Sequence, residues 1–308
     1  MKSIVIIFPY FGKLPVHYKM WRESALRNPS VDFMFFTDAD VEPATNIIVH
    51  KMRFEEFRQY IQAVFDFPIV LDRPYILCDF KPVYGQALQQ FIGKYNFWGY
   101  GDLDVVYGDF RAFFTDEVLS SYKFFLGFGH LTLYRNDEET NTYYKVIIPG
   151  YQDYRKVLTI REQTFFDEYD HKGTADKWKE CRTQDCFLDW QFDNVSIPKQ
   201  SYAMNSLTRG WKQILFEHQG SKLYMLRFNN GKLEKKESLY AHFQHRGYMK
   251  NLVTDYSRFL VTPRGIIDYP RFFVNIRMRW MCRNRSLMTK YYQWKDRIIW
   301  KLGMSKIR

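Results

Sequence analysis

The segment FWGYGDLDVVYGD, residues 97–109, decides the fold and raises the question of function. Its first half is apolar and aromatic and predicts a buried strand, yet Asp102 and Asp104 stand at the end of that strand, and Asp109 follows a glycine. Burial of an unpaired carboxylate costs several kcal/mol. We therefore expect a metal ion, a basic side chain or water to compensate Asp102 and Asp104.

The segments around this strand alternate between strand and helix patterns. Strands are expected at residues 3–8, 31–37, 46–50, 97–104, 123–127, 130–134 and 238–243. Helices are expected at residues 16–27, 53–64, 79–92, 140–147, 183–192 and 251–260. This alternation predicts an α/β fold with a mixed sheet flanked by helices.

Acidic residues end two of the expected strands. Asp38 and Asp40 follow the strand at 31–37, and Asp102 and Asp104 end the strand that begins at Phe97. In sheets of this class the ligand binds beyond the carboxyl ends of the strands. We therefore expect both acidic pairs at the ligand-binding edge of the sheet.

The spacing of Asp102 and Asp104 suits a metal ion. Two aspartates at i and i+2 of an extended segment point to the same side, so their oxygens can bind one divalent cation. Mn²⁺ or Mg²⁺ would keep open positions for phosphate oxygens, and such a site would hold a diphosphate. A solvated strand end is the alternative, because the tripeptide alone is frequent by chance. The buried aromatic strand before it favours the metal.

The cysteines and the N-terminus bear on the compartment. The isolated cysteines show neither a zinc pattern nor a disulfide framework, which favours a reduced, cytoplasmic setting; they are Cys78, Cys181, Cys186 and Cys282. The apolar run from Ile4 to Phe8 is too short for a signal peptide. No apolar stretch is long enough to cross a bilayer.

The positive charge is concentrated at the C-terminus. The chain carries a net charge of +11, and residues 271–308 hold eleven basic residues against Asp296. We expect a catalytic domain at residues 1–255 and a basic helical extension at 256–308. Apolar residues recur at helical spacing in its last part, at Leu287, Tyr291, Trp294, Ile298 and Leu302. This pattern predicts a helix that rests on an anionic membrane surface or packs on the main domain. Nucleic acid is disfavoured, because no nucleic-acid motif accompanies the charge.

Several motifs together resemble a group of bacterial sugar transferases from capsule and lipopolysaccharide gene clusters. In order, they are PYFG (9–12), FTD (36–38), YILCDFKPVYG (75–85), FWGYGDLDVVYGD (97–109) and GHLTLYRN (129–136). The resemblance covers roughly residues 1–250. It implies a GT-A type, Rossmann-like fold and a nucleotide-diphospho-sugar donor, with Asp102 and Asp104 as the metal and diphosphate site.

The resemblance also implies residues that contact the donor. These are Pro9, Tyr10, Phe11, Asp38, Asp79, Lys81, Asp102, His130 and Arg246. A charge-assisted contact from Lys81 to a donor hydroxyl or phosphate is physically sensible. Asp79 can equally cap the helix that contains Pro82, and Asp38 can equally cap a turn.

A third metal ligand is implied late in the chain. GT-A enzymes often supply a histidine there, and His242 in the segment SLYAHFQ matches that position. A histidine satisfied elsewhere in the fold is the alternative. The basic residues nearby favour a role at the diphosphate; they are His245, Arg246 and Lys250.

An inverting transferase needs a carboxylate base for the acceptor hydroxyl. Asp167 or Glu168 is expected in this role, because the tripeptide FDE resembles a segment of the same family. A solvated acidic turn is the alternative for both. The segment QDCFLDW (184–190) offers two further carboxylates, Asp185 and Asp189. Gly129 and His130 are expected near the sugar, with Arg135 and Asn136 behind them.

These observations predict a metal-dependent glycosyltransferase with Mn²⁺ or Mg²⁺ as cofactor. It would transfer a sugar from a nucleotide-diphospho-sugar to a glycan or lipid-linked acceptor, in the cytoplasm or at the inner face of the membrane. A metal-dependent phosphodiester hydrolase would use similar acidic strand ends, with more metal ligands near the first strands. A non-enzymatic protein that binds membrane or nucleic acid through the basic tail is the other alternative.

Overall fold

The computed structural model describes residues 1–189, 192–196, 203–204, 214–229, 232–244, 250–262, 265–272, 274–281, 294 and 298. The chain forms two compact units, each assembled from separate segments. The first unit comprises Met1–Pro15, Asn28–Leu103 and Phe110–Trp190, and the second comprises Val16–Arg27, Asp104–Asp109 and Gln191–Arg308. The boundary expected near residue 255 stays a prediction.

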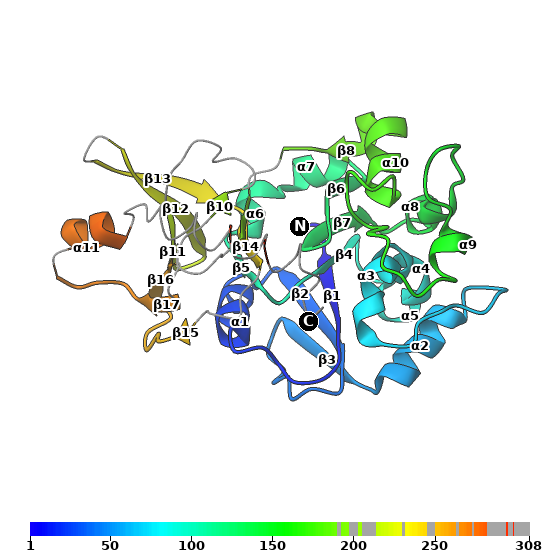
Figure 1. Cartoon of the computed structure of the whole chain (residues 1–308), viewed down its shortest axis with the longest axis horizontal. Helices are drawn as coiled ribbons and strands as arrows, with labels where there is room; N and C mark the ends of the chain where they lie inside the picture. The colour runs from blue at the N-terminus through cyan, green and yellow to red at the C-terminus, as the bar shows by residue number, and fades with distance from the viewer. Residues whose placement is uncertain are drawn as a thin grey trace. The chain divides into compact units, whose positions relative to one another are not determined.

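A mixed sheet forms the centre of the first unit (Figure 1). Its strands are β1 (Ile4–Tyr10), β2 (Val31–Thr37), β3 (Ile47–Lys51), β4 (Phe97–Gly101), β6 (Phe124–Phe128), β7 (Leu131–Arg135) and β8 (Cys186–Phe187). In the described residues their order is β3-β2-β1-β4-β7-β6-β8. The first four strands pair in parallel, β7 is antiparallel to both β4 and β6, and β8 is parallel to β6. The predicted α/β class with a mixed sheet is therefore confirmed.

The alternation of side chains along the strands covers both faces of this sheet. Val5 and Ile7 face one core together with Trp98. Phe33 of the neighbouring strand packs on Phe110 of α6 (Phe110–Phe113), with 6.1 Å between the ring centroids. A strand that is apolar at every position is typical of a sheet buried on both sides. This is why residues 4–8 and 31–37 read as nearly continuous apolar runs.

Short helices flank the sheet. They are α2 (Phe54–Gln62), α3 (Leu77–Phe80), α4 (Tyr84–Ala87), α5 (Gln89–Ile92), α6, α7 (Asp116–Ser121), α8 (Glu138–Thr142), α9 (Tyr154–Val157) and α10 (Thr174–Cys181). Four 3-10 turns of the described residues join them, namely η1 (Pro74–Ile76), η2 (Lys81–Val83), η3 (Tyr143–Lys145) and η4 (Thr183–Asp185). Figure 1 shows α2 to α5 together on one side of the sheet, where their apolar residues belong to a single core.

Three local predictions are wrong in the first unit. The strand expected at 3–8 runs on through Pro9 and Tyr10. It pairs with β4 only as far as Ile7, so Pro9 needs no N–H bond to β4. The helix expected at 79–92 is broken into η2 and short helical turns, because Pro82 cannot donate the bond that would continue a helix. In place of the helix expected at 183–192, Thr183–Asp185 form the 3-10 turn η4. Cys186 and Phe187 then form β8, which pairs with β6.

In its described residues, the second unit contains α1 (Tyr18–Leu26), two sheets and α11 (Val274–Met281). One sheet has the order β10-β9-β14-β5 and consists of β5 (Val105–Tyr107), β9 (Asp193–Ser196), β10 (Ala203–Met204) and β14 (Tyr240–Gln244). The other has the order β13-β12-β11-β16-β17-β15 and consists of β11 (Leu215–Gln219), β12 (Lys222–Asn229), β13 (Lys232–Ser238), β15 (Lys250–Asn251), β16 (Arg258–Thr262) and β17 (Gly265–Asp268).

The helix expected at 251–260 is wrong. Residues 258–262 form β16, which pairs with both β11 and β17, and Phe259 and Val261 enter a core with Phe216 and Met20. The apolar pattern of the segment suits either element, and pairing on both sides decides it. No helix among the described residues is long and apolar enough to cross a bilayer.

Candidate metal centre

Asp102 and Asp104 directly follow β4. The ladder with β7 ends at Gly101, and the backbone N–H of Asp102 donates to the His130 carbonyl oxygen at 3.3 Å. Leu103 and Asp104 form a turn that leads into β5. The predicted position at a strand end is confirmed, but the strand is shorter than expected. The turn, rather than an extended strand, places the two carboxylates.

His242 reaches the same place through β14. Its strand is antiparallel to β5, with His242 opposite Val105, and the Phe243 N–H donates to the Asp104 carbonyl oxygen at 2.9 Å. The ring Nε2 of His242 lies 3.2 Å from Oδ2 of Asp104. Both side chains are buried, at 6% and 3% exposure. The register of two short strands therefore fixes the histidine next to the second aspartate.

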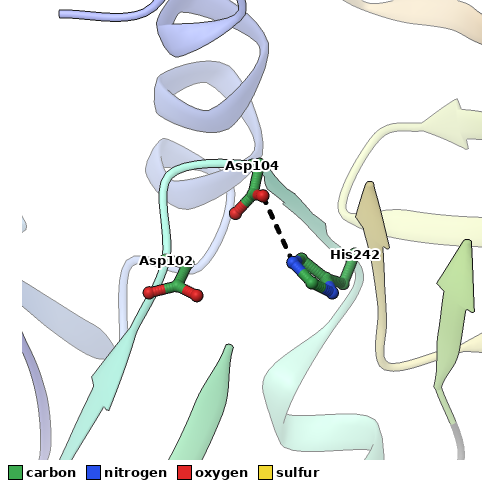
Figure 2. Close-up of side chains that lie close together, drawn as sticks. All are labelled: Asp102, Asp104 and His242. Atoms are coloured by element: carbon green, nitrogen blue, oxygen red, sulfur yellow. Dashed lines mark hydrogen bonds and ion pairs between the residues drawn. The ribbon is translucent and has the colours of Figure 1, made fainter. Parts of the chain in front are cut away.

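The three side chains form a cluster that can hold a metal ion. One ligand atom from each of Asp102, Asp104 and His242 lies within 4.8 Å of the others. Figure 2 shows the Asp104 carboxylate bonded to the His242 ring, with Asp102 beside them. Carboxylate oxygens with one imidazole nitrogen form a donor set that Mn²⁺ accepts, and Mg²⁺ accepts the oxygens. The residues present therefore fit the cation that the sequence predicts.

Lys81 supplies a permanent cation on the other side of Asp102. Its ammonium Nζ donates to Oδ1 of Asp102 at 3.0 Å and to the Gly129 carbonyl oxygen at 2.7 Å, and it lies 3.9 Å from Oδ2 of Asp167. Burial acts to lower the pKa of Lys81, but the negative charge of Asp102 and its neighbours outweighs burial and raises this pKa well above its usual value. Lys81 therefore stays charged and orients Asp102.

Asp167 is a carboxyl group in an apolar, enclosed position. Its side chain is 1% exposed, and Oδ2 has no hydrogen bond in the described residues, although Nζ of Lys81 lies 3.9 Å from it. Burial raises the pKa of Asp167 to about 8, against an opposing effect of Lys81 and with further raising by Glu168. Asp167 is therefore protonated at neutral pH.

Glu168 lies against a glycine. A Cβ on Gly129 would stand 2.3 Å from Oε1 of Glu168 and 3.2 Å from Oδ2 of Asp167. The absence of a side chain at residue 129 therefore makes room for both carboxyl groups. Glu168 is only partly buried, so its carboxylate is the more accessible of the two. Sequence reasoning placed Gly129 near the sugar but gave it no contact with Glu168.

Asp79 anchors the segment that carries these acids. Its buried carboxylate accepts hydrogen bonds from the Thr164 N–H at 2.8 Å, the Thr164 hydroxyl at 3.2 Å and the Phe166 N–H at 2.9 Å. Between these donors, Phe165 has a positive φ of 56°, a conformation that a non-glycine residue rarely adopts. The predicted helix cap is wrong, because Asp79 lies inside α3. No sequence pattern indicates that Asp79 fixes this segment.

Four of the residues expected to contact the donor lie at the ends of β1 and β2. Asp38 is exposed and accepts from the Gly12 N–H at 2.7 Å, Tyr10 donates its hydroxyl to the Lys13 carbonyl oxygen, and Phe11 packs on the core of α2. Pro9 lies in β1, opposite Phe36 of β2. The parallel pairing of β1 and β2 thus brings these residues together where the two strands end. Their contact with a donor stays a prediction.

The other expected residues divide into three groups. His130 is buried and stacks on Phe128 at 5.4 Å, one residue from Gly129. Arg135 and Asn136 donate hydrogen bonds to backbone carbonyl oxygens, so their side chains have structural roles. Asp185 pairs with Arg182, and Asp189 is exposed. His245, Arg246 and the side chain of Lys250 lie outside the described residues, as do most of residues 282–308.

Comparison with known proteins gives a family but no activity. A search of the curated proteins finds no match to this sequence. A family profile matches residues 6–270, which include every member of the cluster. The chain therefore belongs to this family, which is described as a family of unknown function (DUF6625).

Proposed function

We propose that this protein is a metal-dependent glycosyltransferase of GT-A type that uses a nucleotide-diphospho-sugar donor. The observation that carries the proposal is the cluster of Asp102, Asp104 and His242 next to the carboxyl end of a central strand. In α/β sheets this edge is where ligands bind. The order of motifs along residues 9–136, which resembles that of bacterial polysaccharide transferases, supports the same conclusion.

The cluster would hold Mn²⁺ or Mg²⁺ through the two carboxylates and the imidazole. A cation held there supplies charge that binds the donor diphosphate and stabilises the leaving group. Lys81 keeps the Asp102 carboxylate oriented through Oδ1. His242 would bind the cation through a ring nitrogen that carries no proton, and its Nε2 lies 3.2 Å from Oδ2 of Asp104, the neighbouring ligand.

Glu168 is the better base for the acceptor hydroxyl. Asp167 is almost fully buried, and its raised pKa of about 8 leaves it mostly protonated at neutral pH, so only a small fraction of it can take a proton there. Glu168 is more accessible and lies against Gly129. In this proposal Glu168 accepts the proton of a glycan or lipid-linked acceptor hydroxyl as that oxygen attacks the anomeric carbon of the sugar, whose bond to the diphosphate breaks so that the nucleoside diphosphate leaves. Lys81 holds the Asp102 carboxylate in place, and Asp167 lies beside Lys81 in its uncharged form.

We place this reaction in the cytoplasm, where the donor would be available. The sparse cysteines support this placement, since Cys78, Cys181 and Cys186 are free thiols in the structure. Arg246 stays an expected contact to the diphosphate.

A thermal-shift panel tests the proposed function. Nucleoside diphosphates and their sugar conjugates are added with and without Mn²⁺ to the wild type, to Asp104→Asn and to Glu117→Gln. Glu117 is an exposed carboxylate of α7, and its neighbour Asp116 bonds to Lys2 just before β1, away from the carboxyl ends of the strands, so Glu117 serves as the control. A ligand at about 100 times its dissociation constant stabilises the native state by about 2.7 kcal/mol. We expect one nucleotide class to stabilise the wild type and Glu117→Gln in a Mn²⁺-dependent manner, and Asp104→Asn to lose the effect.

Two other results would count against a transferase. Stabilisation by Mn²⁺ alone, with no nucleotide effect, would favour a metal-dependent hydrolase that acts on another substrate. Nucleotide binding that is equal in Asp104→Asn and in the wild type would show that the cluster does not hold the diphosphate.

A further inference from the structure

Helix α11 has one buried and one exposed apolar face. Met278 is fully buried among Leu215, Leu226 and Leu260, and Val274 and Met281 of the same helix pack against this core. The three α11 residues recur at helical spacing and attach the helix (orange in Figure 1) to β11, β12 and β16. Packing against these strands therefore explains why this face of α11 is apolar.

The opposite side of α11 exposes large apolar side chains. Phe272 just before the helix is 74% exposed, Ile276 is 69% exposed and Trp280 is 49% exposed. They follow one another at intervals of four residues, so Ile276 and Trp280 lie on the same side of the helix. An exposed group of large apolar side chains often marks an interaction site, whereas single exposed residues do not.

Basic side chains accompany this exposed face. Arg271 and Arg277 are both exposed next to the apolar residues, and Asp268 is the nearest acidic residue in the sequence before them. The sequence that includes the helix, residues 271–308, carries eleven basic residues and one acidic residue. The partner of this face must therefore accept apolar side chains and be negatively charged.

We propose that the exposed face of α11 docks on an anionic lipid surface. Ile276 and Trp280 enter the boundary between headgroups and acyl chains, and Arg271 and Arg277 contact lipid phosphates. Tryptophan suits this boundary because one end of its ring system is apolar and the other is polar. The proposal concerns α11 and is separate from the helix predicted from Leu287 onward. It stands without the proposed catalytic function.

A lipid surface fits better than a nucleic acid. Single-stranded nucleic acid is bound by aromatic rings on which bases stack, with cations along the backbone. Here an aliphatic residue, Ile276, lies between the two aromatic ones and is more exposed than Trp280. An isoleucine offers no stacking surface, but it enters lipid readily.

Vesicle sedimentation tests this proposal on the full chain. Vesicles of phosphatidylcholine alone are compared with vesicles that contain about one third phosphatidylglycerol, at low and high salt. The test variant is Ile276→Ser with Trp280→Ser, and the control is Leu252→Ser, which removes a 62% exposed side chain from the same unit. Equal melting temperatures of the three proteins show that the fold is kept.

We expect the wild type and Leu252→Ser to bind the anionic vesicles and to be released by salt. The double variant should bind about tenfold more weakly, because two apolar side chains no longer leave water. Arg271→Glu with Arg277→Glu should weaken binding as well. Absence of binding to anionic vesicles, or binding that the double variant leaves unchanged, would overturn the proposal. Binding of single-stranded DNA that requires Ile276 and Trp280, without vesicle binding, would also overturn it.

Discussion

At the scale of single residues, one ammonium group organises the acidic side of the site. Lys81 Nζ bonds to the Asp102 carboxylate and to the Gly129 carbonyl oxygen, and it faces Asp167. A buried lysine is rare unless its charge is paired. The pairing explains why a lysine is tolerated in a core segment, directly before Pro82. It also means that Asp102 already has one cation and would share its two oxygens between Lys81 and a metal.

Replacement of Lys81 by methionine should destabilise the protein. The variant loses two hydrogen bonds of a charged donor, and we expect the free energy of unfolding to fall by about 2–3 kcal/mol. Urea denaturation measures this change. Lys51→Met is the control, because Lys51 likewise bonds to a carboxylate and a carbonyl oxygen, those of Asp40 and Ala39, but is exposed. Exposed ion pairs contribute about 1 kcal/mol or less. An equal effect of the two substitutions would contradict the role of Lys81.

The raised pKa of Asp167 predicts a dependence of stability on pH. Because the folded-state pKa of about 8 lies above the usual value of 3.8, the native state keeps a proton that the unfolded state releases. Stability should therefore fall as the pH rises between about 4 and 8, by up to about 1.4 kcal/mol per pH unit. Asp167→Asn removes this group, so its advantage over the wild type should grow from pH 5 to pH 8 in urea denaturation. A constant difference across this range would show that Asp167 titrates normally.

Gly129 gives a test of Glu168 that leaves its carboxylate intact. In Gly129→Ala the new methyl group would displace the flexible end of Glu168, from which it would be 2.3 Å away. We expect turnover of the donor found in the nucleotide panel to fall by about tenfold to a hundredfold, with little change in melting temperature. The same substitution in a Glu168→Gln background should have no further effect, because the two changes act on one group. Additive losses would show that Gly129 acts through something else.

At the scale of elements, local patterns predict the strands of the first unit well. The strands expected at 31–37 and 46–50 match β2 and β3 to within one residue, and those at 123–127 and 130–134 match β6 and β7 equally closely. These segments are rich in aromatic and branched residues and are bounded by turns. Their local preference and their tertiary pairing agree, so the sequence alone is sufficient.

Pro82 breaks the helix expected at 79–92, and two other failures occur where tertiary pairing decides between two elements. Residues 186–187 and 258–262 each form strands because a neighbouring strand is available. The candidate site divides in the same way. The acidic pair after β4 can be read from the sequence, and His242 follows from the resemblance. The contacts of Lys81 with Asp167, and of Gly129 with Glu168, join segments that no local pattern connects.

The turn from β5 is the element that positions the histidine. Gly108 donates its N–H to the Leu239 carbonyl oxygen at 2.7 Å, and a Cβ at this position would lie 2.4 Å from the Ser238 carbonyl oxygen. Because backbone atoms cannot yield as a side chain can, Gly108→Ala should push β14 away from β5. We expect a loss of about 1–3 kcal/mol in stability together with weaker Mn²⁺ binding, measured by urea denaturation and calorimetry. Unchanged Mn²⁺ affinity would mean that His242 is not a ligand of the metal.

At the scale of the whole molecule, a bound cation should stabilise the native chain. The cluster takes its ligands from the β4–β5 turn and from β14, which come together only in the folded protein. Mn²⁺ at about 100 times its dissociation constant should therefore raise the free energy of unfolding by about 2.7 kcal/mol. Chelation by EDTA should reverse the rise in melting temperature. Asp104→Asn should show neither effect, and an equal response of this variant would mean that Mn²⁺ binds elsewhere.

The central claim is that Asp102, Asp104 and His242 hold the cation of a nucleotide-diphosphate site. The position of Mn²⁺ in crystals grown with a stabilising nucleoside diphosphate tests it most directly, through anomalous scattering at the manganese edge. We predict one peak in contact with both carboxylates, the imidazole and diphosphate oxygens. A peak away from these side chains, or a nucleotide bound with no metal beside them, would contradict the account.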